Sequence, residues 1–135
     1  MNASSVDIMR MLEDYSDSAL GLSFGIDLFI GREPTKPDNC VTIFDTPGGP
    51  PQLTLDEDND DYYYPSIQIR VRNRDYRAGW ALIENIRTVL HGKANETWDT
   101  TTLYTVIYCS SGPALLDWDE SDRARFIINF NLQRR

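Results

Sequence analysis

The chain has 135 residues, a length typical of one domain, which we expect to span residues 1–135. Its formal net charge at pH 7 is -8, which argues against a protein whose main task is to grip nucleic-acid phosphates. It contains neither a signal-peptide pattern nor a run of about 18 apolar residues, so we expect a protein that is neither exported nor inserted in a membrane.

The first predicted element is a short helix that begins after Ser4 or Ser5, either of which can cap its start. Its apolar residues recur at helical spacing and share one face: Ile8, Met11, Leu12 and Tyr15. A helix this short is marginal alone, so we expect it to dock on the rest of the domain.

Two strands are predicted next. Residues 26–30 form the first, which ends at Gly31 and a proline-containing loop over residues 33–39. Residues 40–44 form the second, and their nearly continuous apolar character is typical of a central strand.

Residues 46–61 are rich in proline, glycine and acidic residues, and we expect them to form a long loop. Structureless loops longer than about 12 to 15 residues are uncommon and tend to be functional or disordered. The acidic part starts like a calcium loop, but Asp61 stands where glycine is needed and Ile67 where a bidentate glutamate should bind. A solvated loop, a weak cation site and a partner-docking patch remain open, and the candidate docking residues are Asp56, Asp58 and Asp60.

The clearest pattern covers residues 62–92, where a strand leads directly into a helix. Ile67, Ile69 and Val71 alternate with polar residues, which predicts a half-buried strand. From Asp75 to Gly92 the apolar residues recur at helical spacing: Trp80, Leu82, Ile83, Ile86, Val89 and Leu90. We expect Trp80 at the centre of the core.

The C-terminal third predicts a buried strand over residues 103–109, a break at 110–113, a possible short strand at 114–118 and a turn at 119–122. The last strand alternates apolar and polar residues, with one face formed by Phe126, Ile128, Phe130 and Leu132. The resulting order is α-β-β-β-α-β-β in one α+β domain. We expect a mixed, mainly antiparallel sheet with two helices packed on one face. The crossover helix favours parallel pairing of strands 66–72 and 103–109, and the short loops elsewhere favour hairpins.

Residue types that often carry chemistry are sparse. Cys40 and Cys109 each lie within a predicted strand, typical of buried free thiols, with a disulfide as the weaker alternative. His91 stands at the end of the predicted helix, where it can cap the last turn. No nucleophile or carboxylate constellation surrounds it in sequence, so we expect no catalytic residue, no cofactor and no metal site.

The basic residues concentrate at Arg70, Arg72, Arg74 and Arg77, and tyrosines at 62–64 and 76 flank them. Such a strand face can be solvated, can contact another protein, or can bind single-stranded nucleic acid by charge and stacking. The acidity of the chain weighs against the last use. Arg70, Arg72 and Arg74 are therefore candidate interface residues.

Several short phrases follow one another in a fixed order along the chain. They are LFIG at 28–31 with Pro34, PDN at 37–39, DTPGGPP at 45–51, YP at 64–65, IQIRVR at 67–72, DY at 75–76, IR at 86–87 and LHG at 90–92. This ordered set resembles the tail terminator proteins of long-tailed bacteriophages, also called tail-to-head joining or minor capsid proteins.

The resemblance implies a virion protein that forms a homo-oligomer, a hexameric ring on top of the tail tube. Such a ring ends tube polymerisation and contacts the tail tube protein and a head-completion or connector protein, and DNA passes only through its lumen. It implies assembly in the cytoplasm of the host bacterium and a final place at the head–tail junction. No catalytic residues come with it. The rival classes are a single-stranded nucleic-acid-binding module and a small enzyme.

Overall fold

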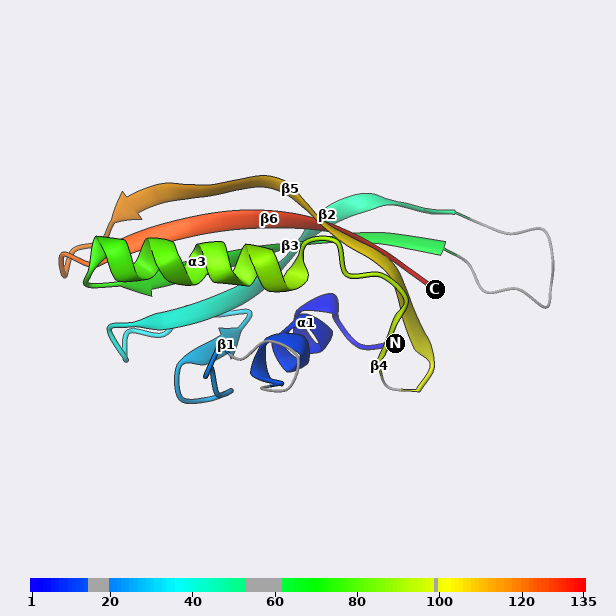
Figure 1. Cartoon of the computed structure of the whole chain (residues 1–135), viewed down its shortest axis with the longest axis horizontal. Helices are drawn as coiled ribbons and strands as arrows, with labels where there is room; N and C mark the ends of the chain where they lie inside the picture. Colours follow the sequence, from blue (N-terminus) through cyan, green and yellow to red (C-terminus); the bar gives the residue numbers. More distant parts are fainter. Residues whose placement is uncertain (15–19, 53–61, 99) are drawn as a thin grey trace.

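One curved sheet carries both helices on the same face (Figure 1). The computed structural model of the chain describes residues 1–14, 20–52, 62–98 and 100–135. The described elements are α1 (Ser4–Glu13), β1 (Leu28–Ile30), β2 (Cys40–Gln52), β3 (Tyr62–Asn73), α3 (Tyr76–Leu90), β4 (Glu96–Trp98), β5 (Thr102–Trp118) and β6 (Ala124–Arg134). The strand order across the sheet is β1-β2-β3-β6-β5-β4. The domain is α+β, as the sequence predicts.

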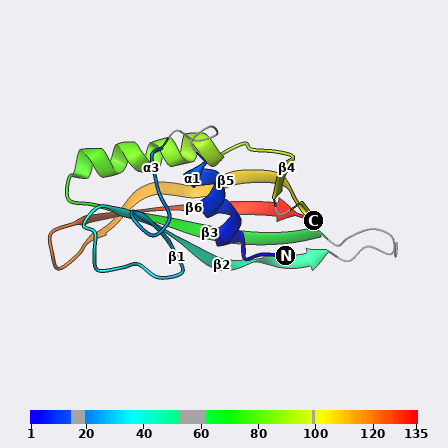
Figure 2. The ribbon, with the colours of Figure 1, turned by 90° about the horizontal axis from the view of Figure 1, so that it is seen from below.

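The core lies between the helices and one face of the sheet, and α3 lies along that face (Figure 2). The central pair is β3 and β6, which run antiparallel with Ile69 opposite Ile128. From Ile67 onward in β3, and along most of β6, every second residue is buried on the helix side: Ile67, Ile69, Val71, Phe126, Ile128, Phe130 and Leu132. Both predicted alternations are therefore confirmed.

The helix α3 begins and ends where the sequence predicts. The side chain of Asp75 caps its start by accepting a hydrogen bond of 3.1 Å from the backbone N–H of Arg77. Gly79 lets the helix approach the sheet, since a Cβ there would lie 2.6 Å from the ring of Phe126. The expectation for Trp80 is wrong: its side chain is 36% exposed, because the helix turns Gly79 and Ile83 toward the sheet instead.

The start of α1 is held by the sheet and not by a serine cap. Ala3 is the N-cap residue and makes no side-chain capping bond, so the expected Ser4 or Ser5 cap is wrong. Asp45 of β2 takes that role by accepting hydrogen bonds from the Ser5 backbone N–H at 3.0 Å and from its hydroxyl at 2.7 Å. Of the predicted apolar face, Tyr15 lies outside the described residues.

Two expected strand pairings are wrong. β1 starts at Leu28 and pairs with β2 in parallel, with Leu28 opposite Val41, instead of forming a hairpin. β3 and β5 run in the same direction but do not pair, because β6 lies between them and pairs antiparallel with both. The connection through α3 thus joins two strands that are separated by one position in the sheet, and β6 occupies that position.

Two strands continue through segments that glycine and proline led us to expect as breaks. Residues 46–52 extend β2, with register shifts between Thr46 and Gln52 that accommodate the glycines and prolines. Residues 110–113 lie within β5, which also shifts register there. A short strand that the sequence did not predict, β4, pairs with residues 102–104 of β5. The remainder of the expected loop, residues 53–61, lies outside the described part of the chain.

Candidate functional site

The sheet face opposite the helices is a polar surface built from cross-strand pairs. Ser66 donates a hydrogen bond of 2.7 Å to Asn131, and Gln68 donates one of 3.2 Å to Asn129. Arg70 belongs to the same face. Its Nε donates to Gln68 at 2.9 Å, and its guanidinium lies 4.8 Å from the ring centre of Phe44 on β2. Arg70 is half-buried, so one side of it remains open to solvent.

Arg72 occupies the next outward position of β3 but is only 3% exposed. The loop that follows β1 covers it: Arg72 donates to the carbonyl of Pro37 at 2.7 Å and to that of Asp38 at 3.2 Å. Its ion pair with Glu33 spans 3.1 Å, and Glu33 also lies 3.5 Å from Arg125 of β6. Arg72 therefore anchors a loop of its own subunit.

Arg74 and Arg123 complete the attachment of this loop. Arg74 forms an ion pair of 2.7 Å with Asp38, and both side chains are about half exposed. That hydrogen bond holds the pKa of the Asp38 carboxyl below its ordinary value. Arg123 is buried and donates to the carbonyl of Thr35 at 2.7 Å and to Asp119 at 2.7 Å. Exposed pairs contribute little to stability, so the buried arginines carry most of this attachment.

The tyrosines that flank the arginines in sequence have separate partners in the structure. Tyr62 accepts a hydrogen bond of 3.1 Å from Arg135, and Tyr64 donates one of 2.8 Å to Gln52 near the end of β2. Tyr76 starts α3 and stacks on Trp118, on the helix side of the sheet. Tyr64 shares the polar face with Ser66 and Asn131, whereas the sheet separates Tyr76 from Arg70. The candidates Asp56, Asp58 and Asp60 lie outside the described residues.

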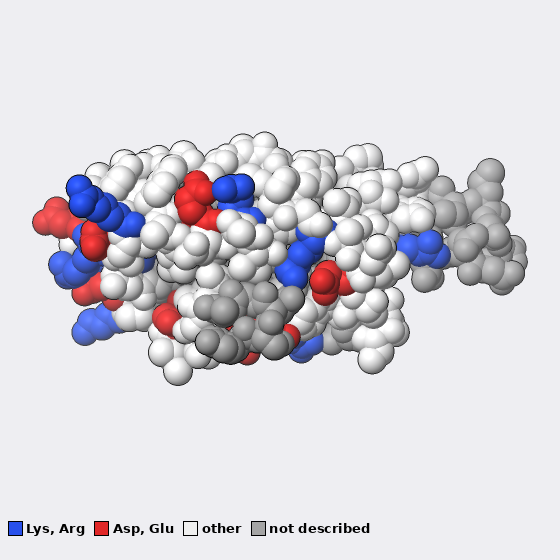
Figure 3. All heavy atoms as spheres, viewed as in Figure 1, with Lys and Arg blue, Asp and Glu red and all other residues white. Residues whose placement is uncertain are grey.

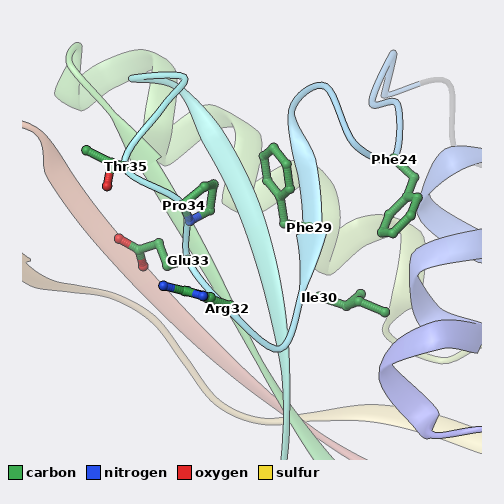
Figure 4. A pocket seen from close by; sticks show the side chains of 7 residues that line it. All are labelled: Phe24, Phe29, Ile30, Arg32, Glu33, Pro34 and Thr35. Atoms are coloured by element: carbon green, nitrogen blue, oxygen red, sulfur yellow. The ribbon is translucent and has the colours of Figure 1, made fainter.

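The loop after β1 also forms one wall of a recess of about 450 Å³ at the edge of the sheet (Figure 4). Its lining combines three apolar side chains with a short polar segment: Phe24, Phe29, Ile30, Arg32, Glu33, Pro34 and Thr35. Ile26 lies beside it, in a second hollow that shares Phe29. Phe24 is 48% exposed and Ile26 is 70% exposed. We call Phe24, Ile26 and Phe29 the β1-edge patch.

A second exposed apolar surface lies where β5 ends and α3 begins. It consists of Tyr76, Trp80, Leu115 and Trp118, each between 36% and 52% exposed. Tyr76 stacks on Trp118 with ring centres 6.2 Å apart, Tyr76 and Trp80 pack edge-on against the buried ring of Phe126, and Leu115 lies opposite Phe126 in the sheet. We call these four residues the β5-edge patch.

Sequence reasoning missed both patches. Leu115 lies opposite Phe126, and the register of β5 shifts between Leu115 and Asp117, so regular alternation could not show which of the two consecutive leucines joins the helix side. Around the β5-edge patch, acidic and basic side chains lie interspersed at the end of the molecule where α3 begins (Figure 3). Contiguous exposed apolar patches mark contact surfaces more often than single exposed residues do.

His91, Cys40 and Cys109, whose residue types often carry chemistry, have contacts that serve the fold. His91 stands at the end of α3 as predicted, but its side chain has another role than the expected capping: its Nδ1 accepts a hydrogen bond of 2.9 Å from the Cys109 backbone N–H, which fastens the helix to β5. Both cysteines are free; Cys40 is buried and Cys109 half-buried, and burial raises the pKa of each thiol. Within the described ranges, no three His, Cys, Asp or Glu side chains are grouped to hold a metal ion.

None of the helices in the described part of the chain combines the length and apolar character needed to cross a bilayer.

Comparisons with known proteins identify a family and a similar fold. Residues 8–135 match a protein family described as "Bacteriophage tail terminator protein". A solved chain from the "Virion of native gene transfer agent (GTA) particle" has a similar fold, with a TM-score of 0.62 and 14% sequence identity over 94% of this chain and 90% of that chain. A comparison with curated proteins gave no match.

Proposed function

Because the chain belongs to the bacteriophage tail terminator family, we propose that it is a structural protein of the virion that closes into a hexameric ring on the tail tube. The ring ends polymerisation of the tail tube protein and joins the tail to a head-completion or connector protein. DNA passes through its lumen during ejection without being bound. The protein assembles in the cytoplasm of the host bacterium, lies at the head–tail junction and has no catalytic role.

The family match carries this proposal, since it extends over residues 8–135 and so includes nearly the whole domain. The likeness to a chain of a virion particle adds support at the level of the fold alone. The two exposed apolar patches are also consistent with a chain that functions in an assembly, where such surfaces become covered.

The charges have assigned parts in this proposal. Arg70 and Arg74 remain partly exposed and can contact a neighbouring subunit, where complementary charge fixes register more than affinity. Arg72 acts on such a contact through the loop that it holds. Asp56, Asp58 and Asp60 are the proposed acidic partners. The net charge of -8 per chain would favour a lumen that repels phosphate and lets DNA pass.

A polymerisation assay tests the proposed function. Tail tube protein is allowed to polymerise with and without this chain, and tube lengths and tube ends are measured by negative-stain microscopy. We expect added chain to arrest growth and to leave a cap at one tube end. Tubes that continue to grow at an unchanged rate, with bare ends at every ratio of the two proteins, would contradict the proposal.

A further inference from the structure

We propose that the β5-edge patch of one subunit packs on the β1-edge patch of the next subunit, and that this contact, repeated around the circle, closes the ring. This inference rests on the proposed function and adds to it the surfaces that meet. The occupant of each patch is thus a second copy of this chain.

The positions of the two patches in the sheet carry the first step. β1 is one edge of the strand order, and residues 110–118 of β5 pair only with β6 within the described chain, which leaves their outer side as the opposite edge. Figure 1 shows the two edges on opposite sides of the molecule. A ring needs a heterologous contact in which two different patches of one subunit meet two different neighbours. Unlike patches on opposite edges meet that requirement.

The shapes and residue types carry the second step. The β5-edge patch presents aromatic and leucine side chains that stand clear of the core, with Trp118 52% exposed. The β1-edge patch borders a recess of about 450 Å³ whose exposed walls include the rings of Phe24 and Phe29. Tryptophan and tyrosine are enriched among the residues that contribute most to protein contacts, where they fill pockets on the partner.

Charge carries the third step and distinguishes a second copy from another occupant. Arg32 and Lys36 are exposed beside the recesses, whereas Glu120 and Asp122 are exposed in the turn directly after Trp118. Glu33 and Asp38, the acidic residues that line the recesses, are already paired with arginines of the sheet, so Arg32 and Lys36 are the charges left for a partner there. Arg77 is also exposed beside the β5-edge patch, but the turn after Trp118 is acidic. The acidic turn of one copy and the basic rim of the next can therefore attract each other and fix the register of the contact.

Two single variants test the contact. Leu115→Arg places a charge on the β5-edge patch, and Ile26→Arg places one on the β1-edge patch; both residues are at least 40% exposed, so the fold should persist. We expect each variant to lose ring formation in native mass spectrometry, with an unchanged circular dichroism spectrum. Tyr108→Arg is the control, because Tyr108 is 43% exposed but belongs to neither patch, and it should still form rings.

Mixing the two variants gives the sharper result. Each keeps one intact patch, so a mixture can form only one good contact and should stop at a heterodimer. A charge exchange controls for misfolding. The double variant Glu120→Lys with Asp122→Asn should abolish rings, and so should the double variant Arg32→Glu with Lys36→Glu. A chain that carries all four changes should form rings again.

Each other outcome has one meaning. Rings that persist in both single variants, when the wild-type chain forms rings, would overturn this inference and leave the proposed function intact. Variants that form rings but no longer cap tubes would also overturn it, since the patch would then face the tube. A wild-type chain that neither forms rings nor caps tubes would contradict the proposed function itself.

Discussion

At the scale of single residues, a buried polar cluster connects the two ends of the chain. Asp7 in the first turn of α1 is fully buried and accepts a hydrogen bond of 2.6 Å from the hydroxyl of Tyr104. Arg134 near the C-terminus donates to that hydroxyl at 3.0 Å and to the carbonyl of Asn2 at 2.9 Å. Burial and the bond to Asp7 raise the pKa of Tyr104, so the hydroxyl stays a donor. The partners are too far apart in sequence for any local pattern to reveal them.

Tyr104→Phe should destabilise the domain by about 1–3 kcal/mol, because it removes a donor from a buried carboxylate and leaves that carboxylate partly unsatisfied. Urea unfolding at neutral pH measures the change. Tyr108→Phe is the matched control, since the Tyr108 hydroxyl is near the surface and accepts only a bond of 3.3 Å from Asn131. Equal unfolding midpoints for the two variants would show that the buried cluster is energetically unimportant.

Asp117 and Arg125 give a prediction about pH. Arg125 donates to Asp117 at 2.6 Å through Nε and again through Nη2, and this pairing holds the pKa of Asp117 below its ordinary value of 3.8. A carboxyl whose pKa is lowered by folding stabilises the fold above its unfolded pKa and loses that effect as pH falls through the folded value. The pair is partly exposed, so we expect a contribution of at most about 1 kcal/mol.

Asp117→Asn should therefore lower the melting temperature slightly at pH about 6, and the difference from the wild type should shrink as pH falls below 3.8. Thermal melts across this range measure it. Glu120→Gln, an exposed residue in the adjacent turn, serves as the control. A difference that grows toward acid pH would contradict the pairing.

Arg72 shows what could not be predicted from the sequence at the scale of single residues. Alternation correctly placed Arg70 and Arg72 on the face away from the helices. It could not show that the loop after β1 folds over one of them, because that contact joins segments more than 30 residues apart. The prediction for Trp80 was wrong for a related reason. Helical spacing identifies the apolar face of a helix, but close packing against Phe126 places Gly79 at the centre of that face.

At the scale of elements, the local sequence pattern predicted the positions of the most regular strands and helix. The strand β3, the helix α3 and the strand β6 have clear periodicity and lie where expected. Strand pairing was harder to predict from the sequence, because periodicity within a strand does not show which strand lies between β3 and β5. Glycine and proline also misled in β2 and β5, because register shifts let a strand continue through them.

The extension of β2 depends on one glycine and gives an element-scale prediction. A Cβ on Gly48 would lie 2.0 Å from the backbone oxygen of Tyr64, whereas a Cβ on Gly49 would lie 3.4 Å from its nearest neighbour, the Tyr64 side chain. Gly48→Ala should thus separate the ends of β2 and β3, and Gly49→Ala should leave them paired.

Amide hydrogen exchange in residues 62–64 measures the effect. We expect at least tenfold faster exchange in Gly48→Ala than in Gly49→Ala, which corresponds to about 1.4 kcal/mol of lost pairing. Identical exchange in the two variants would mean that the strand ends adjust without separating. Faster exchange in both would instead point to a general effect of glycine replacement.

At the scale of the whole molecule, one small domain leaves apolar surface uncovered on both edges of its sheet. The ordered phrases of the sequence indicated the family, and the match over residues 8–135 confirms it. The β5-edge patch lay beyond sequence reasoning, because it combines residues of α3 and β5 that only the fold brings together. The β1-edge patch is local in sequence, but its exposure depends on how the chain before β1 lies at the sheet edge.

The central claim is that this chain closes into a ring that caps tail tubes. Native mass spectrometry of the purified chain, combined with negative-stain images of the same sample alone and with tail tubes, tests it most directly. The account predicts a closed species of six times the 15.5 kDa chain mass and caps at one end of the tubes. A species that remains a single chain at every concentration and leaves tube ends bare would contradict it.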